Sequence, residues 1–155
     1  RFGELTARRK TAEEKLAKLE ASLQQQNPLE SKKKIASRPG DKGIRFLDPD
    51  GQHAITCFQW LDDMPGGCSL LKAMPKTGRT NQIRLHLWDA GFPIVGDPTY
   101  LRDGQLGVNQ TLGMNDTPMQ LHALRIAFVH PLSKKEVAFE AEAPQWAKSE
   151  SLLTL

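Results

Sequence analysis

Two arginines, Arg79 and Arg84, stand five residues apart in the stretch PKTGRTNQIRLHLWDAGFPIVGDPTY, which begins at Pro75. A guanidinium is always charged and binds carboxylates and phosphates through paired N–H donors. The first turn of a helix also presents unpaired backbone N–H groups, and its dipole favours anions. Two cations at such a helix start would therefore form a binding site for a carboxylate or a phosphate.

The helix that would carry this site is expected over residues 80–90. Thr80 or Asn81 is the natural N-cap, because both side chains can accept a hydrogen bond from the first turn. Gly91 and Pro93 should end the helix. The resulting element is short and begins directly after a Pro-Lys-Thr-Gly turn.

Helical side chains lean toward the N-terminus, so Arg84 should approach Arg79 and the amide of Gln82. From spacing alone, an ordinary amphipathic helix with two solvated arginines is favoured over an anion site. The candidate binding residues around the helix start are Lys76, Thr77, Gly78, Arg79, Asn81, Gln82 and Arg84.

The remaining segments predict hairpins with interspersed helices. Residues 53–74 alternate and carry a Pro-Gly-Gly turn, which favours an antiparallel hairpin. Residues 94–119 are rich in loop formers, and residues 120–128 and 136–143 read as two further strands before a short helix at Pro144. This order predicts an α+β domain rather than a βαβ fold.

The N-terminal third has a different character. A capping box at Thr11 and a leucine stripe predict a helix over residues 11–26. Residues 28–52 are interpreted as a polar connector. Its lysine run is either a solvated surface or a set of phosphate contacts, made by Lys32, Lys33 and Lys34.

The composition excludes several classes of protein. No stretch of the 155 residues approaches the about 20 apolar residues that span a bilayer, and the first ten residues lack a signal-peptide core. We therefore expect no membrane partner and no secretion, but a cytoplasmic or organellar matrix protein. Cys57 and Cys68 could form a disulfide across the hairpin, although two reduced thiols are preferred. The four histidines are scattered, so no metal site is expected.

The charge is concentrated near the N-terminus. Residues 1–50 hold 12 Lys and Arg against 8 Asp and Glu, whereas the whole chain has a net charge of +3. A mild basic excess fits a nucleic-acid partner, but many soluble proteins share it.

The segments TGRTNQIRLHL and GFPIVGDPTY resemble the hallmark motif of the RluA-type pseudouridine synthases, usually TGRTHQIRxHL followed by GxPIxGDxxY. GQHAIT, at Gly51–Thr56, and LHALRIAFVHPLSKKEVAFEAEAP, at Leu121–Pro144, resemble strands of the same family. The resemblance covers about residues 45–146 in the family's order. It therefore implies the C-terminal half of such a catalytic domain, with a mainly antiparallel mixed sheet that is incomplete here and follows the N-terminal helix.

The resemblance implies an enzyme that converts uridine in rRNA or tRNA to pseudouridine without a cofactor. The uridine is flipped into the site and attacked by an aspartate. The glycosidic bond then breaks, and the base rotates and rejoins the ribose through C5. At the position of Arg84 the family has the ion-pair partner of that aspartate, while Arg79 is expected to hold RNA backbone or support the loop. The turn residues of the motif are Gly96, Asp97 and Tyr100.

Two features depart from the family pattern. Asn81 stands where histidine is usual, and the upstream HRLDxxTSG motif with the nucleophile has no counterpart in the sequence. Asp97 is interpreted as a cap of its turn rather than as the nucleophile. We expect Arg84 to pair with an aspartate outside this chain, in the upstream half of the same protein or in a separate chain.

These observations lead to a set of expectations. The domains are a helix and basic connector over 1–50, a half catalytic domain over 51–147 and a tail over 148–155. The intact protein is expected to be a pseudouridine synthase and this chain alone inactive. The alternative is a non-catalytic RNA-binding or ribosome-assembly module derived from such an enzyme.

Overall fold

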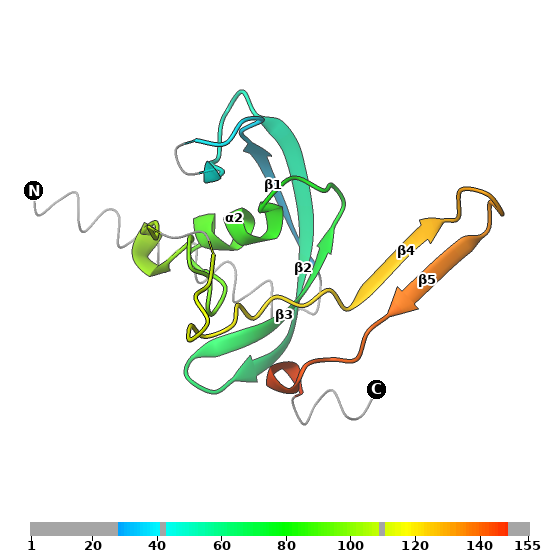
Figure 1. Ribbon diagram of the computed structural model, residues 1–155. Coiled ribbons are helices and arrows are strands. Elements are labelled where there is room, and N and C mark those ends of the chain that lie inside the picture. Colours follow the sequence, from blue (N-terminus) through cyan, green and yellow to red (C-terminus); the bar gives the residue numbers. More distant parts are fainter. Residues whose placement is uncertain (1–27, 41–42, 109–110, 149–155) are drawn as a thin grey trace, which may run out of the picture. The chain divides into compact units, whose positions relative to one another are not determined.

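A computed structural model describes residues 28–40, 43–108 and 111–148 of the chain. The described residues form two compact units, which meet in sequence between Met119 and Gln120. The first holds three antiparallel strands and one α-helix, and the second holds a β-hairpin (Figure 1). The predicted α+β class is confirmed for this part of the chain, while the helix predicted over residues 11–26 lies outside it.

The sheet of the first unit runs in the order β1-β2-β3, with β1 at Leu29–Ile35, β2 at Gln52–Met64 and β3 at Cys68–Pro75. β2 and β3 form the predicted antiparallel hairpin, and their register shifts between Trp60 and Asp62. Its turn contains two glycines with positive φ, which suit the tight reversal after Pro65.

The prediction that residues 28–52 form a polar connector was wrong for β1. This strand pairs antiparallel with β2, from Leu29 opposite Phe58 to Ile35 opposite Gln52. Its lysines are compatible with a strand because β1 lies at the edge of the sheet, where charged side chains also discourage pairing with other chains. The predicted domain boundary after residue 50 stays a prediction, although the strands on either side of it share one sheet.

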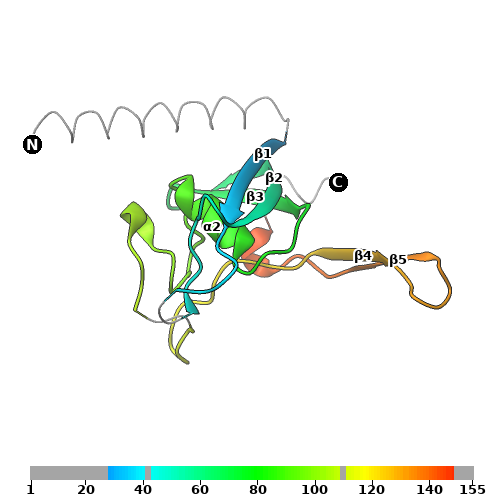
Figure 2. The ribbon, with the colours of Figure 1, turned by 90° about the horizontal axis from the view of Figure 1, so that it is seen from above.

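Helix α2, at Gln82–Asp89, packs against β1 and β2 (Figure 2). The core between them consists of buried apolar side chains, with Leu47 and Trp88 packed around it: Ile35, Ile44, Ala54, Leu85 and Tyr100. β2 reaches this interface through alternate residues, whereas α2 buries Gln82, Leu85 and His86, which lie on one face of the helix. Burial of these side chains therefore fixes the face of α2 that can carry a site.

One polar side chain in this interface has no partner for its hydrogen bonds. His86 is 1% exposed and packs its ring edge-on against Phe58. Neither ring nitrogen has a hydrogen-bond partner in the part of the chain that the structure describes. Burial, assisted by the positive charge of Lys33, lowers the pKa of His86 below its ordinary value. The neutral form of the ring is therefore the one that fits the core.

After α2 the chain turns at Gly91, where φ is 90°, as predicted for the helix end. The following turn places Gly96 with φ 75°, and a Cβ at this position would lie 2.5 Å from the carbonyl oxygen of Pro118. Only glycine fits both conditions. The segment then forms a 3-10 turn at Arg102–Gly104 and returns to pair Leu106 with Tyr100.

The second unit contains β4 at Arg125–Val129 and β5 at Glu136–Glu140. They pair antiparallel, as predicted, with Phe128 and Phe139 stacked at 6.2 Å between ring centroids. Both strands are shorter than the sequence pattern indicated. The helix expected at Pro144 is a single 3-10 turn at Gln145–Ala147.

Among the described residues, none of the helices has the length and apolar composition that crossing a lipid bilayer requires.

Candidate active site

Arg84 lies in α2 and forms a two-pronged ion pair with Asp97. Its Nε and Nη2 each donate to one carboxylate oxygen at 2.7 Å. The side chain of Arg84 is 14% exposed and that of Asp97 is fully buried. Such parallel hydrogen bonds fix the plane of the guanidinium, and burial strengthens them because little water competes.

The Asp97 carboxylate is ionised in this setting. Burial raises the pKa of Asp97, but the hydrogen bonds from Arg84 and from the backbone N–H groups of Tyr100 and Thr99 outweigh it. The pKa of this carboxyl therefore lies below its ordinary value. Asp97 Oδ1 accepts from the backbone nitrogens of Thr99 at 2.8 Å and of Tyr100 at 3.0 Å. The same carboxylate thus caps its own turn and orients Arg84.

Asn81 supplies a second contact to Arg84. The Asn81 side-chain oxygen accepts from Arg84 Nη1 at 3.1 Å. Asn81 is the N-cap residue of α2, but it has φ 57° and makes no side-chain capping bond, contrary to the expected cap geometry. Asparagine tolerates this left-handed backbone better than most residues. Its side chain therefore serves Arg84 instead of the helix end.

The ring of Tyr100 packs against the guanidinium of Arg84. The Arg84 guanidinium carbon is 4.9 Å from the centroid of the Tyr100 ring, a cation–π distance. The Tyr100 hydroxyl donates to the carbonyl of Arg45 at 2.9 Å and accepts from the Arg45 backbone nitrogen at 3.2 Å. It also accepts from Asn81 Nδ2 at 3.4 Å. Burial is the main reason that the pKa of Tyr100 is raised, so the hydroxyl stays protonated.

Three of the five N–H donors of Arg84 are used by Asp97 and Asn81. The other two, one on each terminal nitrogen, have no partner within residues 28–40, 43–108 and 111–148. Arg84 is therefore a rigid cation that can still bind a further carboxylate. Sequence reasoning missed Asp97 as its partner, and the available signal was the Gly-Asp-Pro turn that follows the helix.

Thr77 and Gln82 hold the loop before α2 to strand β2. Gln82, 3% exposed, donates to the Ile55 carbonyl at 3.0 Å and to Thr56 Oγ1 at 2.9 Å. Its side-chain oxygen accepts from Thr77 Oγ1 at 2.7 Å and from the Arg79 backbone nitrogen at 3.0 Å. These two predicted RNA-binding side chains face inward. They position Gly78, Arg79 and the start of the helix.

Most of the predicted cationic contacts already have partners in the chain. Lys32 and Lys76 both pair with Glu30, at 3.1 Å and 3.2 Å, and Lys33 pairs with Asp89 of α2. The ammonium of Lys34 donates to the Pro49 carbonyl at 2.7 Å. Arg79 is exposed, and its Nε donates to the His53 carbonyl at 3.2 Å. The structure does not bring the lysine run to Arg84, and RNA binding by these residues stays a prediction.

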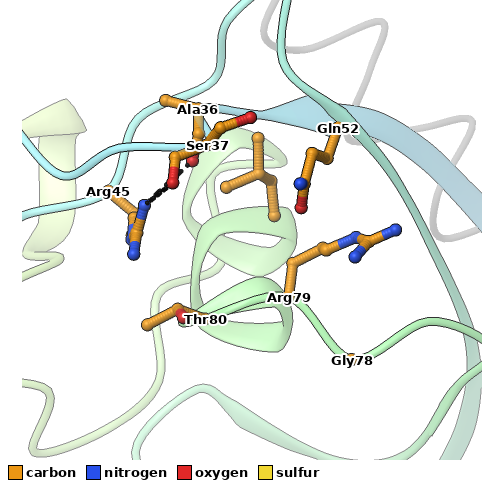
Figure 3. Close-up of a pocket in the computed structure, with 8 residues that line it drawn as sticks. Ala36, Ser37, Arg45, Gln52, Gly78, Arg79 and Thr80 are labelled. Atoms are coloured by element: carbon orange, nitrogen blue, oxygen red, sulfur yellow. Dashed lines mark hydrogen bonds between the residues drawn. The ribbon is translucent and has the colours of Figure 1, made fainter.

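A small pocket of about 120 Å³ lies beside the start of α2. Its polar lining comes from β1 and the residues after it, from β2 and from the loop before the helix: Ser37, Arg45, Gln52, Arg79 and Thr80 (Figure 3). Arg45 was not among the candidates from the sequence. It lies in a polar segment without a motif, so no local signal marked it.

No protein-family model matches the chain. It is 34% identical over 63% of its length to the Ribosomal large subunit pseudouridine synthase D of Zymomonas mobilis, of which it covers 31%. It is 33% identical over 59% of its length to the Dual-specificity RNA pseudouridine synthase RluA of Pasteurella multocida, of which it covers 38%. The chain thus spans about a third of the length of these curated relatives.

The fold has a counterpart among solved structures. Human RNA Pseudouridylate Synthase Domain Containing 4 matches 77% of this chain and 53% of its own with a TM-score of 0.53 and 23% sequence identity. The fold and the curated relatives agree with the motifs TGRTNQIRLHL and GFPIVGDPTY, which contain Arg84 and Asp97. On these grounds the chain belongs to the RluA-type family of RNA pseudouridine synthases.

Proposed function

We propose that the intact protein isomerises uridine to pseudouridine in structured RNA, and that this chain supplies the arginine side of the active site. The observation that carries the proposal is Arg84, whose guanidinium is held by Asp97 and Asn81 with two N–H donors remaining. A nucleophilic carboxylate in a buried site needs such a fixed cation to stay ionised. Relatives that share these motifs are named RNA pseudouridine synthases.

The nucleophile itself is proposed to come from outside this chain. Asp97 is a poor candidate, because both of its oxygens accept hydrogen bonds from Arg84 and Oδ1 accepts two more from the backbone. An attacking carboxylate needs an accessible oxygen with a free lone pair, and the Asp97 side chain is fully buried. The aspartate would approach the two open donors of Arg84 and attack the ribose-linked uridine from there.

RNA would reach the site along the exposed residues beside the helix start. Arg79 and Lys76 are exposed, and Gly78 leaves open space around the loop. The lysine run on β1 would add weaker, salt-sensitive attraction through Lys32 and Lys34, whose side chains are exposed. Thr77 and Gln82 would act by holding the loop in place rather than by touching RNA.

The proposed partners are rRNA or tRNA and the polypeptide that carries the nucleophile, either the upstream half of the same protein or a separate chain. Cys57 and Cys68 are both free thiols, which fits a reducing compartment such as the cytoplasm or an organellar matrix.

The direct test is conversion of uridine by the intact protein. RNA labelled with tritium at C5 of uridine releases the label when C5 becomes the glycosidic carbon. We expect release with the intact protein and none with the isolated 155 residues, which lack the nucleophile. Catalytic release by the isolated residues would overturn the division of the site between two segments, and no release by the intact protein on any RNA would overturn the activity.

A second candidate is a non-catalytic RNA-binding or ribosome-assembly module. One observation favours it: Asp97 already neutralises Arg84, so the arginine is stable without a further carboxylate. In that case the intact protein would bind RNA and release no tritium. Replacing Arg84 would then weaken stability, and RNA affinity would follow only through the loss of folded protein.

A further inference from the structure

The pocket beside the start of α2 has properties that the catalytic pair does not explain. Arg45 and Arg79 lie on opposite sides of it (Figure 3). Its lining, as far as the structure describes the chain, contains neither aspartate nor glutamate. The positive charges of these two arginines are therefore not matched by a carboxylate in the lining of this pocket of about 120 Å³.

Arg45 is held in place by the main chain around it. Its Nη1 donates to the carbonyl oxygens of Ala36 at 3.1 Å and Ser37 at 2.7 Å. Its backbone nitrogen and oxygen are both bonded to the Tyr100 hydroxyl. In the described ranges no group accepts from Nη2, and Nε is buried without a partner. Arg45 is therefore a pre-oriented cation whose charge no carboxylate of the described residues matches.

Arg79 provides the opposite wall. Among the described residues its side chain bonds only through Nε, at the His53 carbonyl, so both terminal nitrogens keep their donors within this part of the chain. Ser37, Gln52 and Thr80 add hydroxyl and amide groups to the lining. No side-chain hydrogen bond is formed by these three residues among the described residues. The lining thus combines two arginines, whose guanidiniums point in different directions in Figure 3, with several neutral donors. Arginines and neutral hydroxyl and amide donors are the groups that commonly bind phosphate.

We propose that this pocket binds a phosphodiester group of the RNA strand that carries the target uridine. Thr80 of the pocket precedes Asn81, and the backbone of Arg45 is bonded to Tyr100, which contacts Arg84. The phosphate would therefore lie next to the target nucleotide and fix the position of the strand. The identity of the ligand as substrate RNA rests on the proposed function, whereas the phosphate chemistry rests on the pocket itself.

The test measures RNA binding by the intact protein between 50 and 200 mM salt, with a fluorescently labelled single-stranded RNA. Each arginine that contacts phosphate should contribute about 0.7 to the slope of log Kd against log salt. We expect Arg79→Gln and Arg45→Gln each to lower the slope by about that amount and to raise Kd about tenfold at low salt. Arg45→Lys should restore most of the slope, because a point charge still attracts phosphate.

Arg102→Gln is the matched control, since Arg102 is an exposed arginine of the same unit that lies outside the pocket. Its slope should equal that of the parent protein. Circular dichroism identifies any variant that fails to fold, and Arg79→Gln is the safer one because its side chain is exposed. Equal slopes for Arg79→Gln, Arg102→Gln and the parent protein would overturn the inference.

Tritium release separates this inference from the proposed function. If the pocket variants keep the full slope while the parent protein releases tritium, the phosphate site is wrong and the activity stands. If the parent protein releases no tritium but the pocket variants lose slope, the phosphate site stands without catalysis.

Discussion

Arg84 and Arg79 begin the same helix region, five residues apart, yet they lie in opposite environments. Arg84 is 14% exposed, has three hydrogen bonds to two side chains and packs on an aromatic ring. Arg79 is exposed and has one bond to a backbone carbonyl. A fixed cation suits stabilisation of charge during a reaction, whereas a free one suits attraction of a polyanion. Under the proposed function, Arg84 would serve the chemistry and Arg79 the binding of RNA.

The same substitution at both positions gives the largest expected contrast. Arg84→Lys keeps the charge but loses the planar guanidinium that holds Asp97. We therefore expect the kcat of the intact protein on RNA to fall about 100-fold. Arg79→Lys should leave kcat unchanged and raise KM less than about threefold. Steady-state tritium release measures both constants. Equal losses of kcat in the two variants would remove the distinction between the arginines.

The ion pair of Arg84 depends on the buried carboxylate of Asp97. Asp97→Asn leaves Arg84 partly buried without its counter-ion, and we expect the free energy of unfolding to fall by about 3 kcal/mol. Asp103→Asn is a matched control, because Asp103 is an exposed turn residue with φ 56°, a backbone that asparagine accepts. Urea denaturation at pH 7 measures both. Similar losses in the two variants would mean that the ion pair adds little.

The lowered pKa of Asp97 predicts how the stability of the folded protein depends on pH. Because the folded pKa is lowered, its contribution to stability is present above the ordinary value of 3.8 and disappears as pH falls through the folded pKa. The parent protein should therefore lose more stability on acidification below that value than Asp97→Asn does. Parallel unfolding curves in acid would contradict the assignment.

The buried His86 predicts a second dependence of stability on pH, nearer to neutrality than that of Asp97. Its folded pKa is lowered by burial, so the folded state prefers the neutral ring, and stability should decline as pH falls below the ordinary value of 6.5. The decline is at most about 1.4 kcal/mol per pH unit. In His86→Gln the urea concentration at the midpoint of unfolding should change less between pH 7.5 and 5.5 than it does in the parent protein. In His53→Gln, at an exposed position, the midpoint should fall with pH as in the parent protein. An unchanged decline in His86→Gln would assign it to other groups.

Asn81 should give the smallest effect. Asn81→Gly removes the contact to Arg84 Nη1 but suits the left-handed backbone, whereas Asn81→Ala removes the contact and adds backbone strain. We expect Asn81→Ala to be less stable than Asn81→Gly by about 1 kcal/mol, and both to lower kcat only a few-fold. A loss of kcat as large as that of Arg84→Lys would place Asn81 in the chemistry itself.

The elements that sequence predicted correctly are those with local signals. The hairpin of β2 and β3 follows from alternation around a Pro-Gly-Gly turn, and α2 follows from its glycine end. β1 was missed because Lys32–Lys34 suggested a solvated surface, and only its pairing with β2 makes it a strand. Its stability comes from a partner more than 15 residues away, which no local pattern contains.

In the candidate site, too, the sequence predicted what local motifs contain and missed what depends on packing. The motif identified Arg84 and the turn around Asp97, but not that their side chains meet, because that contact depends on how α2 and the turn pack. For the same reason the motif did not indicate that Gln82 bonds to Thr77 and to the backbone of β2, and RNA binding by these two residues stays a prediction. Arg45 became a candidate binding residue only in the structure, where its backbone is hydrogen-bonded to the Tyr100 hydroxyl.

Gly96 has a consequence for how mutations in this protein are interpreted. It touches no reactive group, yet its φ is 75° and a Cβ on it would lie only 2.5 Å from the Pro118 carbonyl oxygen, which leaves no room for a side chain. If the proposed activity holds, a screen for lost modification of RNA would score Gly96→Ala together with variants of Arg84. The next residue, Asp97, orients Arg84, so a shift of this turn would misalign the guanidinium. Loss of activity at a family motif is therefore evidence of chemistry only when the backbone can accept the replacement.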